Sequence, residues 1–99
     1  MSVRGGASLN VRQSSTGNHF FEEYTSTTLY VERAFGFTAQ HVTITNDATT
    51  DIDIDVSWDG ATLHGSLKKK ESIEYHPAEQ SSVYLRADSG TPTIRVFAE

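Results

Sequence analysis

The residues with the clearest capacity for chemistry are three aspartates in the stretch DIDIDVSWDG. Asp51, Asp53 and Asp55 have the spacing of the first three ligands of an EF-hand loop, which also requires a glycine at position six and a bidentate glutamate at position twelve. Val56 and Thr62 occupy those two positions. The alternating Ile and Val favour an extended chain instead. We therefore predict an acidic β-strand and no metal centre.

The pair Asp59-Gly60 predicts a two-residue type I′ turn after this strand. The pairs expected on the apolar face are Trp58–Ala61, Val56–Leu63, Ile54–Gly65 and Ile52–Leu67. On the acidic face the expected pairs are Asp55–His64, Asp53–Ser66 and Asp51–Lys68, where opposite charges stabilise by ~0.2–1 kcal/mol each. Alternate strand residues stand ~6.7 Å apart. Asp53 and Asp55 therefore leave open only a weak surface site for a divalent cation.

No other residues have the spacing of a catalytic or cofactor-binding motif. His19, His41, His64 and His76 show neither HxH nor HExxH spacing, and no GxSxG sequence occurs. The neighbouring acids Glu22-Glu23 point to opposite faces of a strand. The glycines lack the spacing of a phosphate-binding loop. We therefore expect a protein that is not an enzyme and binds no cofactor.

Composition narrows the class of partner. The chain has 99 residues, a formal net charge of −5 and no cysteine. The acidic balance argues against a nucleic-acid backbone or an anionic membrane surface as a partner. No apolar run approaches the ~20 residues of a membrane span. We therefore expect protein partners, with no nucleic acid and no membrane.

Short β-prone runs with a period of two residues fill the chain from Thr28 onward. The expected strands are Thr28–Arg33, His41–Asn46, Ile52–Trp58, Thr62–Leu67, Ser72–His76, Ser82–Ala87 and Thr93–Ala98. Turn-forming pairs such as Asn46-Asp47 and Ser89-Gly90 separate them. Regularly spaced short strands predict an all-β fold. We expect a small antiparallel β-sandwich or barrel of about six to eight strands over residues 28–99.

The first 27 residues differ from this pattern. They are rich in Gly, Ser, Asn and Gln and show no helical period. Such a segment buries too little apolar surface to offset its ordering entropy alone. It is either disordered or an arm that becomes ordered against another chain, and we predict an extended polar arm over residues 1–27. The predicted interface residues are Leu9, Val11, Phe20, Phe21 and Tyr24.

A characteristic order of short motifs covers residues 35–99. FGF is followed by VTITND, an acidic run ending in SWDG, HGSLK leading into ESI, then SVYLR and a final RVFAE. This order resembles that of a class of small virion structural proteins of tailed bacteriophages. The resemblance implies a component of the virion and includes no catalytic motif.

We therefore expect a non-enzymatic structural protein that forms a symmetric homo-oligomer and binds other virion proteins. The favoured role is capsid decoration or an accessory role on the head. A head–tail joining or tail component is an alternative, and so is a carbohydrate-binding β-sandwich module. The last alternative requires exposed aromatic side chains, whereas the predicted register places Trp58 on the apolar face.

Overall fold

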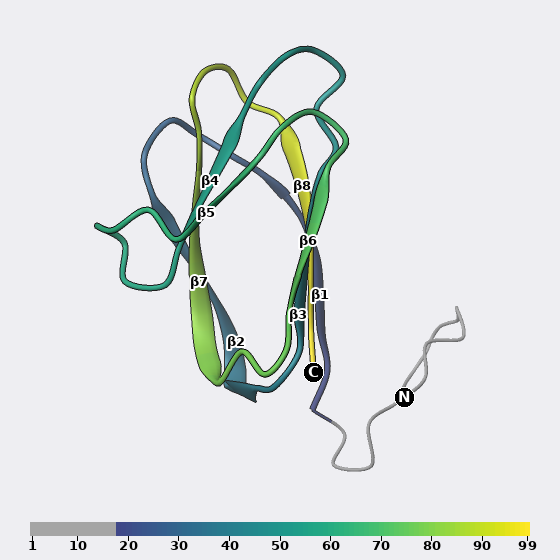
Figure 1. Ribbon diagram of the computed structural model, residues 1–99, viewed down its shortest axis with the longest axis vertical. Helices are drawn as coiled ribbons and strands as arrows, with labels where there is room; N and C mark the ends of the chain where they lie inside the picture. Colours follow the sequence, from purple (N-terminus) through teal and green to yellow (C-terminus); the bar gives the residue numbers. More distant parts are fainter. Residues whose placement is uncertain (1–17) are drawn as a thin grey trace.

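The computed structural model describes residues 18–99, which form two facing four-stranded antiparallel sheets (Figure 1). In chain order the strands are β1 (Phe20–Thr25), β2 (Val31–Ala39), β3 (Val42–Asn46), β4 (Ile54–Ser57), β5 (Gly65–Leu67), β6 (Ser72–Tyr75), β7 (Gln80–Ala87) and β8 (Thr93–Ala98). The predicted all-β antiparallel fold is confirmed.

The strand order determines how the chain builds both layers. Sheet A has the order β1-β8-β3-β6, and sheet B has the order β2-β7-β4-β5. Within the described residues, every connection except that between β4 and β5 passes from one sheet to the other. Each of these loops therefore spans the thickness of the sandwich, and its ends must be held in both sheets.

The core is made of the side chains that point inward from alternate residues of the strands. The fully buried aliphatic side chains are Val42, Ile44, Ile54, Val56, Val83, Leu85, Ile94 and Val96. They come from the two central strands of each sheet. Burying one such side chain stabilises the fold by about 1.5–3 kcal/mol. The branched aliphatics of the central strands therefore hold the two sheets together.

The sandwich begins earlier than the sequence pattern suggested. Residues 20–25, expected to belong to the arm, form β1 and pair continuously with β8. Phe20 and Tyr24 pack against the core, while Phe21 is 54% exposed. The expected boundary at residue 28 therefore lies in the loop that joins β1 to β2.

The register of β4 with β5 differs by two residues from the predicted one. Ile54 pairs with Leu67, and Val56 pairs with Gly65. Residues 58–64 form a wide loop in place of the predicted two-residue turn. Among the residues that pair, a shift of two keeps each side chain on its predicted face, because side chains alternate with a period of two. Leu63, predicted on the apolar face, instead lies in the loop and is 57% exposed. The apolar side of β4 is therefore buried as expected, although the individual pairs are not those predicted.

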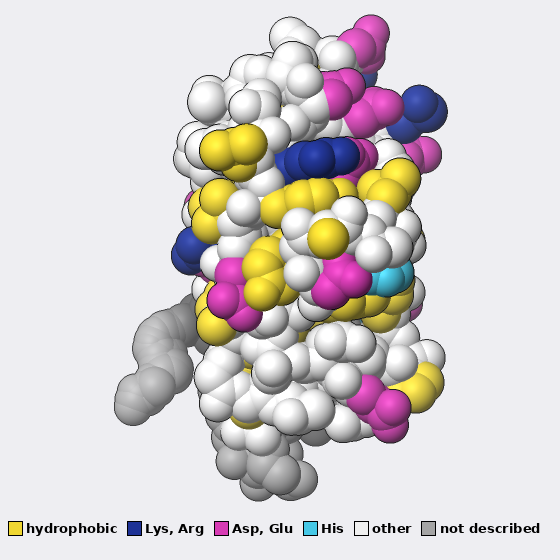
Figure 2. Space-filling model, turned by 90° about the vertical axis from the view of Figure 1, so that its left-hand side faces the viewer, with side chains coloured by type: hydrophobic (Ala, Val, Ile, Leu, Met, Phe, Trp, Pro, Cys, Tyr) yellow, Lys and Arg dark blue, Asp and Glu magenta, His cyan; other side chains and the backbone are white. Residues whose placement is uncertain are grey.

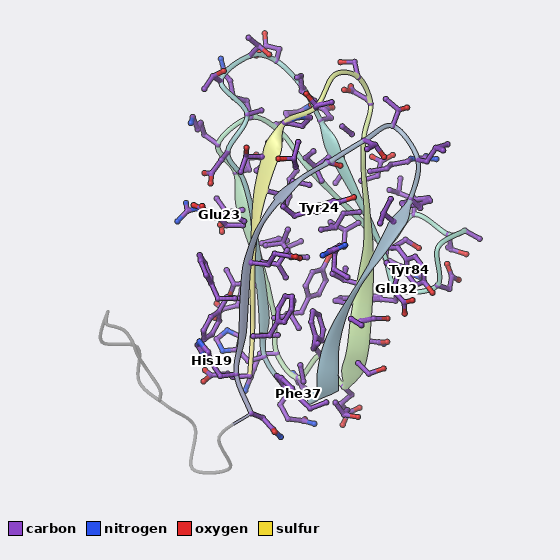
Figure 3. All side chains as sticks on the ribbon, turned by 180° about the vertical axis from the view of Figure 1, so that it is seen from behind. His19, Glu23, Tyr24, Glu32, Phe37 and Tyr84 are labelled. Atoms are coloured by element: carbon purple, nitrogen blue, oxygen red, sulfur yellow. The ribbon has the colours of Figure 1, made fainter. Side chains whose placement is uncertain are left out.

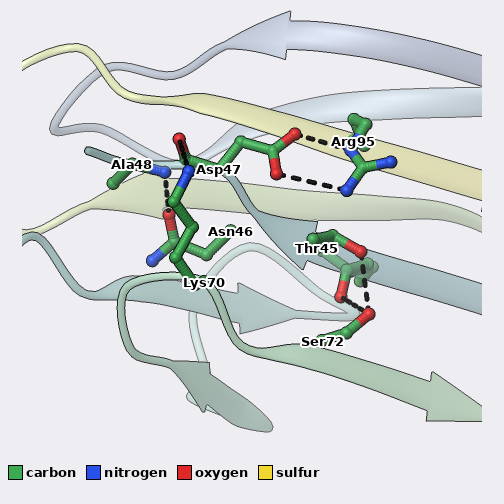
Figure 4. A network of polar contacts seen from close by, with 8 residues as sticks. Thr45, Asn46, Asp47, Ala48, Lys70, Ser72 and Arg95 are labelled. Carbon is green, nitrogen blue, oxygen red and sulfur yellow. Dashed lines mark hydrogen bonds and ion pairs between the residues drawn. The ribbon is translucent and has the colours of Figure 1, made fainter.

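The fully buried Asn46 ties the end of β3 to the opposite sheet. Its Nδ2 donates to the carbonyl oxygens of Ile52 (2.8 Å) and Leu67 (3.1 Å), and its Oδ1 accepts from the amide of Ala48 (2.9 Å). Its backbone amide also donates to Glu71 O at 2.9 Å. Figure 4 shows this residue among the loops that leave β3 and β5. One side chain thus fixes the crossing loop after β3 and the end of β5.

A close contact between edge strands closes the β5–β6 side of the sandwich. The Tyr75 ring packs edge-on against Trp58, with 4.9 Å between the ring centroids. A Cβ added to Gly65 would overlap the Tyr75 hydroxyl oxygen. That oxygen is buried and has no hydrogen-bond partner among the described residues, and burial raises the pKa of Tyr75. Glycine at position 65 is therefore required by the ring that lies over it.

We predict that Asn46→Ala lowers the free energy of unfolding by about 2–3 kcal/mol, because two buried carbonyl groups lose their donor. Urea unfolding of both proteins measures this difference. Thr45→Ala is the matched control, because Thr45 bonds the exposed Ser72 hydroxyl and lies outside the core. A loss at position 46 no greater than the loss at position 45 would contradict the role given to the carboxamide.

We also predict that Gly65→Ala destabilises the protein by about 1–3 kcal/mol through overpacking against Tyr75. Tyr75→Phe should change stability by less than about 1 kcal/mol, because the hydroxyl it removes has no partner. In the double variant most of the Gly65→Ala loss should disappear. Equal losses in the two backgrounds, measured by urea unfolding, would show that the hydroxyl is not the obstacle.

Candidate interaction surface

Three aspartates of the stretch from Asp51 to Gly60 form ion pairs: Asp55 lies on β4, and Asp51 and Asp53 lie just before it. Arg86 Nε lies 2.9 Å from Asp55 Oδ2, and Lys68 Nζ lies 3.6 Å from Asp53 Oδ2. Asp51 lies 3.4 Å from Lys69 Nζ. No group of three potential metal ligands occurs within residues 18–99. The predicted strand Ile52–Trp58 is confirmed in its central part, because β4 spans Ile54–Ser57 with Ile54 and Val56 fully buried. Asp51 and Asp53 precede the strand.

The outer face of sheet B mixes charge with scattered apolar groups. Figure 2 shows this face, with basic and acidic side chains lying among the hydrophobic ones. Arg86 also covers the Tyr30 ring at 4.3 Å from the centroid. The neighbouring Tyr84 ring lies against Gly60, which has φ of 81° in the loop between β4 and β5. Much of this face is therefore occupied by contacts within the chain.

Asp59 organises that loop from its exposed tip. Its Oδ1 accepts the amides of Thr62 (2.7 Å) and Ala61 (2.8 Å), and the Ser57 hydroxyl donates to the same oxygen. The hydrogen bond from Thr62, followed by that from Ala61, lowers the pKa of Asp59. The Asp-Gly pair was predicted to make a tight turn. The carboxylate instead holds three donors, and this requires the wider loop.

The side where β1 and β2 face each other is closed by a pair between the sheets. Arg33 Nε on β2 donates to Glu22 Oε1 on β1 at 2.8 Å, and a second guanidinium nitrogen bonds the other carboxylate oxygen. The guanidinium also lies 4.5 Å from the Tyr24 ring centroid. The bond to Glu22 raises the pKa of Arg33. Glu22 and Tyr24 therefore serve the fold of their own chain.

The outer face of sheet A carries the exposed Phe21 directly opposite Phe97 of β8. His19 packs edge-on against Phe97, with 5.2 Å between the ring centroids. On the other side of Phe97, His41 contacts the carboxylates of Glu74 and Glu99. Figure 3 shows His19 and Glu23 on this outer side, with Tyr24 between the sheets. An aromatic patch bordered by carboxylates thus lies next to the point where the described chain begins.

Each sheet has two edges, and three of these four edge strands are short or irregular. β5 has three residues and β6 has four. The pairing of β2 with β7 shifts between Ala34 and Ala39. Short strands and bulges are features that block the addition of a further strand. β1 differs from the other three, because its six residues pair with β8 without any shift.

The hydrogen-bond pattern shows which backbone groups of β1 lie on the edge that pairs with no other described strand. Ser26 N donates to Pro92 O, in line with the register of β1 with β8. In an antiparallel pair, alternate residues exchange both hydrogen bonds with their partner. Phe20, Glu22 and Tyr24 therefore bond β8. The amides and carbonyls of the intervening residues, Phe21, Glu23 and Thr25, point away from it.

The predicted interface residues thus occupy different environments. Phe20 and Tyr24 face the core, and Phe20 lies 5.3 Å from Phe35 between ring centroids. Phe21 alone of the three faces solvent. Leu9 and Val11 lie outside the described residues. The sequence pattern did not identify Glu23 or Thr25, whose significance comes from strand pairing and not from residue type.

A hollow of about 300 Å³ lies where the loops after β3 and β7 meet. Threonines, Asp47 and Pro92 line much of it, and no aromatic residue is among its lining side chains. Asp47 is itself paired with Arg95, at 2.6 Å between Oδ2 and Nε (Figure 4). Trp58 packs against Tyr75 and the core. The hollow therefore offers no aromatic ring on which a sugar could stack.

No family model matches the chain, and no curated protein matches it. Within residues 18–99 there is no helix long and apolar enough to cross a membrane.

We predict that Asp59 makes the stability of the protein depend on pH. The pKa of Asp59 is lower in the folded chain than the value of about 3.9 that it has in the unfolded chain. The carboxylate therefore contributes fully to folding stability above that pH, and this contribution is lost as the pH falls below it. The stability difference between the natural chain and Asp59→Asn, measured by urea unfolding, should therefore shrink from pH 6 to pH 2. Asp51→Asn serves as the control, because the Asp51 side chain is 95% exposed. A difference at position 59 that stays constant with pH would contradict the prediction.

Proposed function

We propose that this chain is a non-enzymatic structural protein of a tailed-phage virion, which assembles as a homo-oligomer through its N-terminal segment. Its proposed position is the capsid surface, as a decoration or accessory protein. The head–tail junction and the tail are alternative positions. The proposal rests on the motif order of residues 35–99 together with the structure of residues 18–99.

The observation that carries the assembly role is the division of charge along the chain. Residues 1–17 contain Arg4 and Arg12 and no acidic residue. Residues 18–99 hold the other six basic residues and all thirteen acidic ones, so their net charge is −7. A basic segment joined to an acidic body favours contact between one copy and the next, because complementary potentials attract and orient partners.

The contacts of the ionisable groups also support a structural role. Glu22, Asp47 and Asp55 each bind an arginine side chain, and Asp59 caps a loop. A catalytic acid or base needs a substrate within hydrogen-bond reach and a pKa near the working pH. These groups are instead occupied by contacts that hold strands and loops in place.

We predict that purified particles of the phage that encodes this chain contain it in hundreds of copies, measured by quantitative mass spectrometry. About six or twelve copies, or another small multiple of three, would move the proposal to the neck or tail. Absence from the particles would overturn the virion role.

The same particles test the N-terminal segment. A variant without residues 1–17 should fold, because β1 begins at Phe20, but it should not be incorporated. Circular dichroism confirms folding of the variant, and the full-length chain supplied in parallel is the control. Normal incorporation of the truncated chain would contradict the role given to the segment.

A further inference from the structure

The free edge of β1 is the regular acceptor edge of the described fold. Its outward-pointing backbone groups come from Phe21, Glu23 and Thr25, and the three other edge strands are short or irregular. A regular open edge is a template for an added strand, which binds through main-chain hydrogen bonds. The edge can therefore accept one short added strand.

The sequence SLNVRQS, residues 8–14, has the pattern that this edge requires. Leu9 and Val11 alternate with the polar Asn10 and Arg12. Such alternation gives a strand with one apolar and one polar face. The two faces match β1, whose even-numbered residues point into the sandwich and whose odd-numbered residues point to solvent.

Charge selects one register among those that preserve these faces. With Arg12 opposite Glu23, Asn10 lies opposite Thr25 on the solvent side. Val11 then lies opposite Tyr24 on the core side. In this register the only basic residue of the segment faces a carboxylate directly, and an opposite-charge pair across strands is stabilising.

Pairing of β1 with β1 of a second copy is disfavoured by the same rule. An antiparallel pair centred on a twofold axis at Glu23 places that residue opposite its own copy. Like charges directly opposite each other destabilise a sheet. The register that aligns all three outward residues of two β1 strands is thus unfavourable, whereas a basic strand in the same place is favourable.

We infer that the β1 edge of one copy binds residues 9–14 of a second copy as an additional antiparallel strand of sheet A. The inference rests on the proposed homo-oligomer and identifies its contact. Residues 15–17 join the proposed strand to Asn18, and the four residue steps from Ser14 to Asn18 span at most about 14 Å. The copy that accepts the strand must therefore lie directly against the copy that donates it.

Disulfide trapping tests the contact, because the natural chain contains no cysteine. An Asn10→Cys chain mixed with a differently tagged Thr25→Cys chain should form a mixed disulfide dimer under mild oxidation. Directly opposed residues are about 5.5 Å apart between Cα atoms, which a disulfide can bridge. Asn10→Cys mixed with Thr38→Cys is the control and should remain monomeric on a non-reducing gel, because Thr38 lies on β2 of sheet B.

Two results would overturn the inference: no mixed dimer, or closure of the disulfide within single chains of the Asn10→Cys/Thr25→Cys double variant. The latter would place the strand on its own β1. The trapping result is independent of the virion role. If the mixed dimer forms but the protein is absent from the particles, only the proposed function is refuted. If the protein is abundant in the particles but no mixed dimer forms, only this contact is refuted.

Charge reversal tests the register. Arg12→Glu should slow mixed-dimer formation about fivefold, because an attractive cross-strand pair becomes repulsive. Arg4→Glu makes the same charge change outside the proposed strand and should have a smaller effect. Equal effects of the two variants would show that general attraction, and not the Arg12–Glu23 pair, brings the chains together.

Discussion

The buried carboxamide of Asn46 is the interaction on which the rest of the sandwich depends. Since all but one of the described connections cross between the sheets, the chain forms few local hairpins that could hold a loop by themselves. Asn46 supplies donors to Ile52 O and Leu67 O and an acceptor to Ala48 N, and so joins β3, the following loop and β5. A buried polar group whose bonds are satisfied stabilises one arrangement over others, because every alternative leaves those bonds unmade. The central aliphatics supply most of the burial, and Asn46 determines where the loops lie.

Ion pairs within the chain occur on both sheets. On sheet B, Asp55 and Arg86 pair within the chain, and Asp59 is engaged by amides of its own loop. On sheet A, Glu22 is drawn inward by Arg33, whereas Glu23 remains on the outer side beside the free edge. Because adjacent side chains of a strand point to opposite faces, Glu22 stabilises the fold and Glu23 lies on the surface. On that face Glu23 lies opposite Arg95 of β8 and next to the edge of β1 that pairs with no other described strand.

Much of the fold follows from the alternation of apolar and polar residues in the sequence. The strand β8 has the predicted bounds, and β3 and β6 lie within one residue of theirs, because Val, Ile and Thr alternate cleanly there. β1 was not predicted, because the doublets Phe20-Phe21 and Glu22-Glu23 hide the alternation that pairing with β8 imposes. The β4–β5 loop was predicted too short, because Asp59-Gly60 is a strong signal for a two-residue turn. The hydrogen bond from the Thr62 amide to the Asp59 carboxylate, which widens the loop, cannot be recognised from the sequence. The edge surface was only partly predictable: exposure of Phe21 follows from alternation, but the free backbone groups depend on which strand becomes the neighbour.

Hydrogen exchange along β1 tests the central claim, that this edge is open in one copy and is filled on assembly. In a chain lacking residues 1–17, the amides of Phe21, Glu23 and Thr25 should exchange rapidly, whereas those of Glu22 and Tyr24, bonded to β8, stay protected. In the assembled full-length protein all five amides should be protected. Rapid exchange of the three outward amides in both proteins, or equal protection of all five in both, would contradict the account.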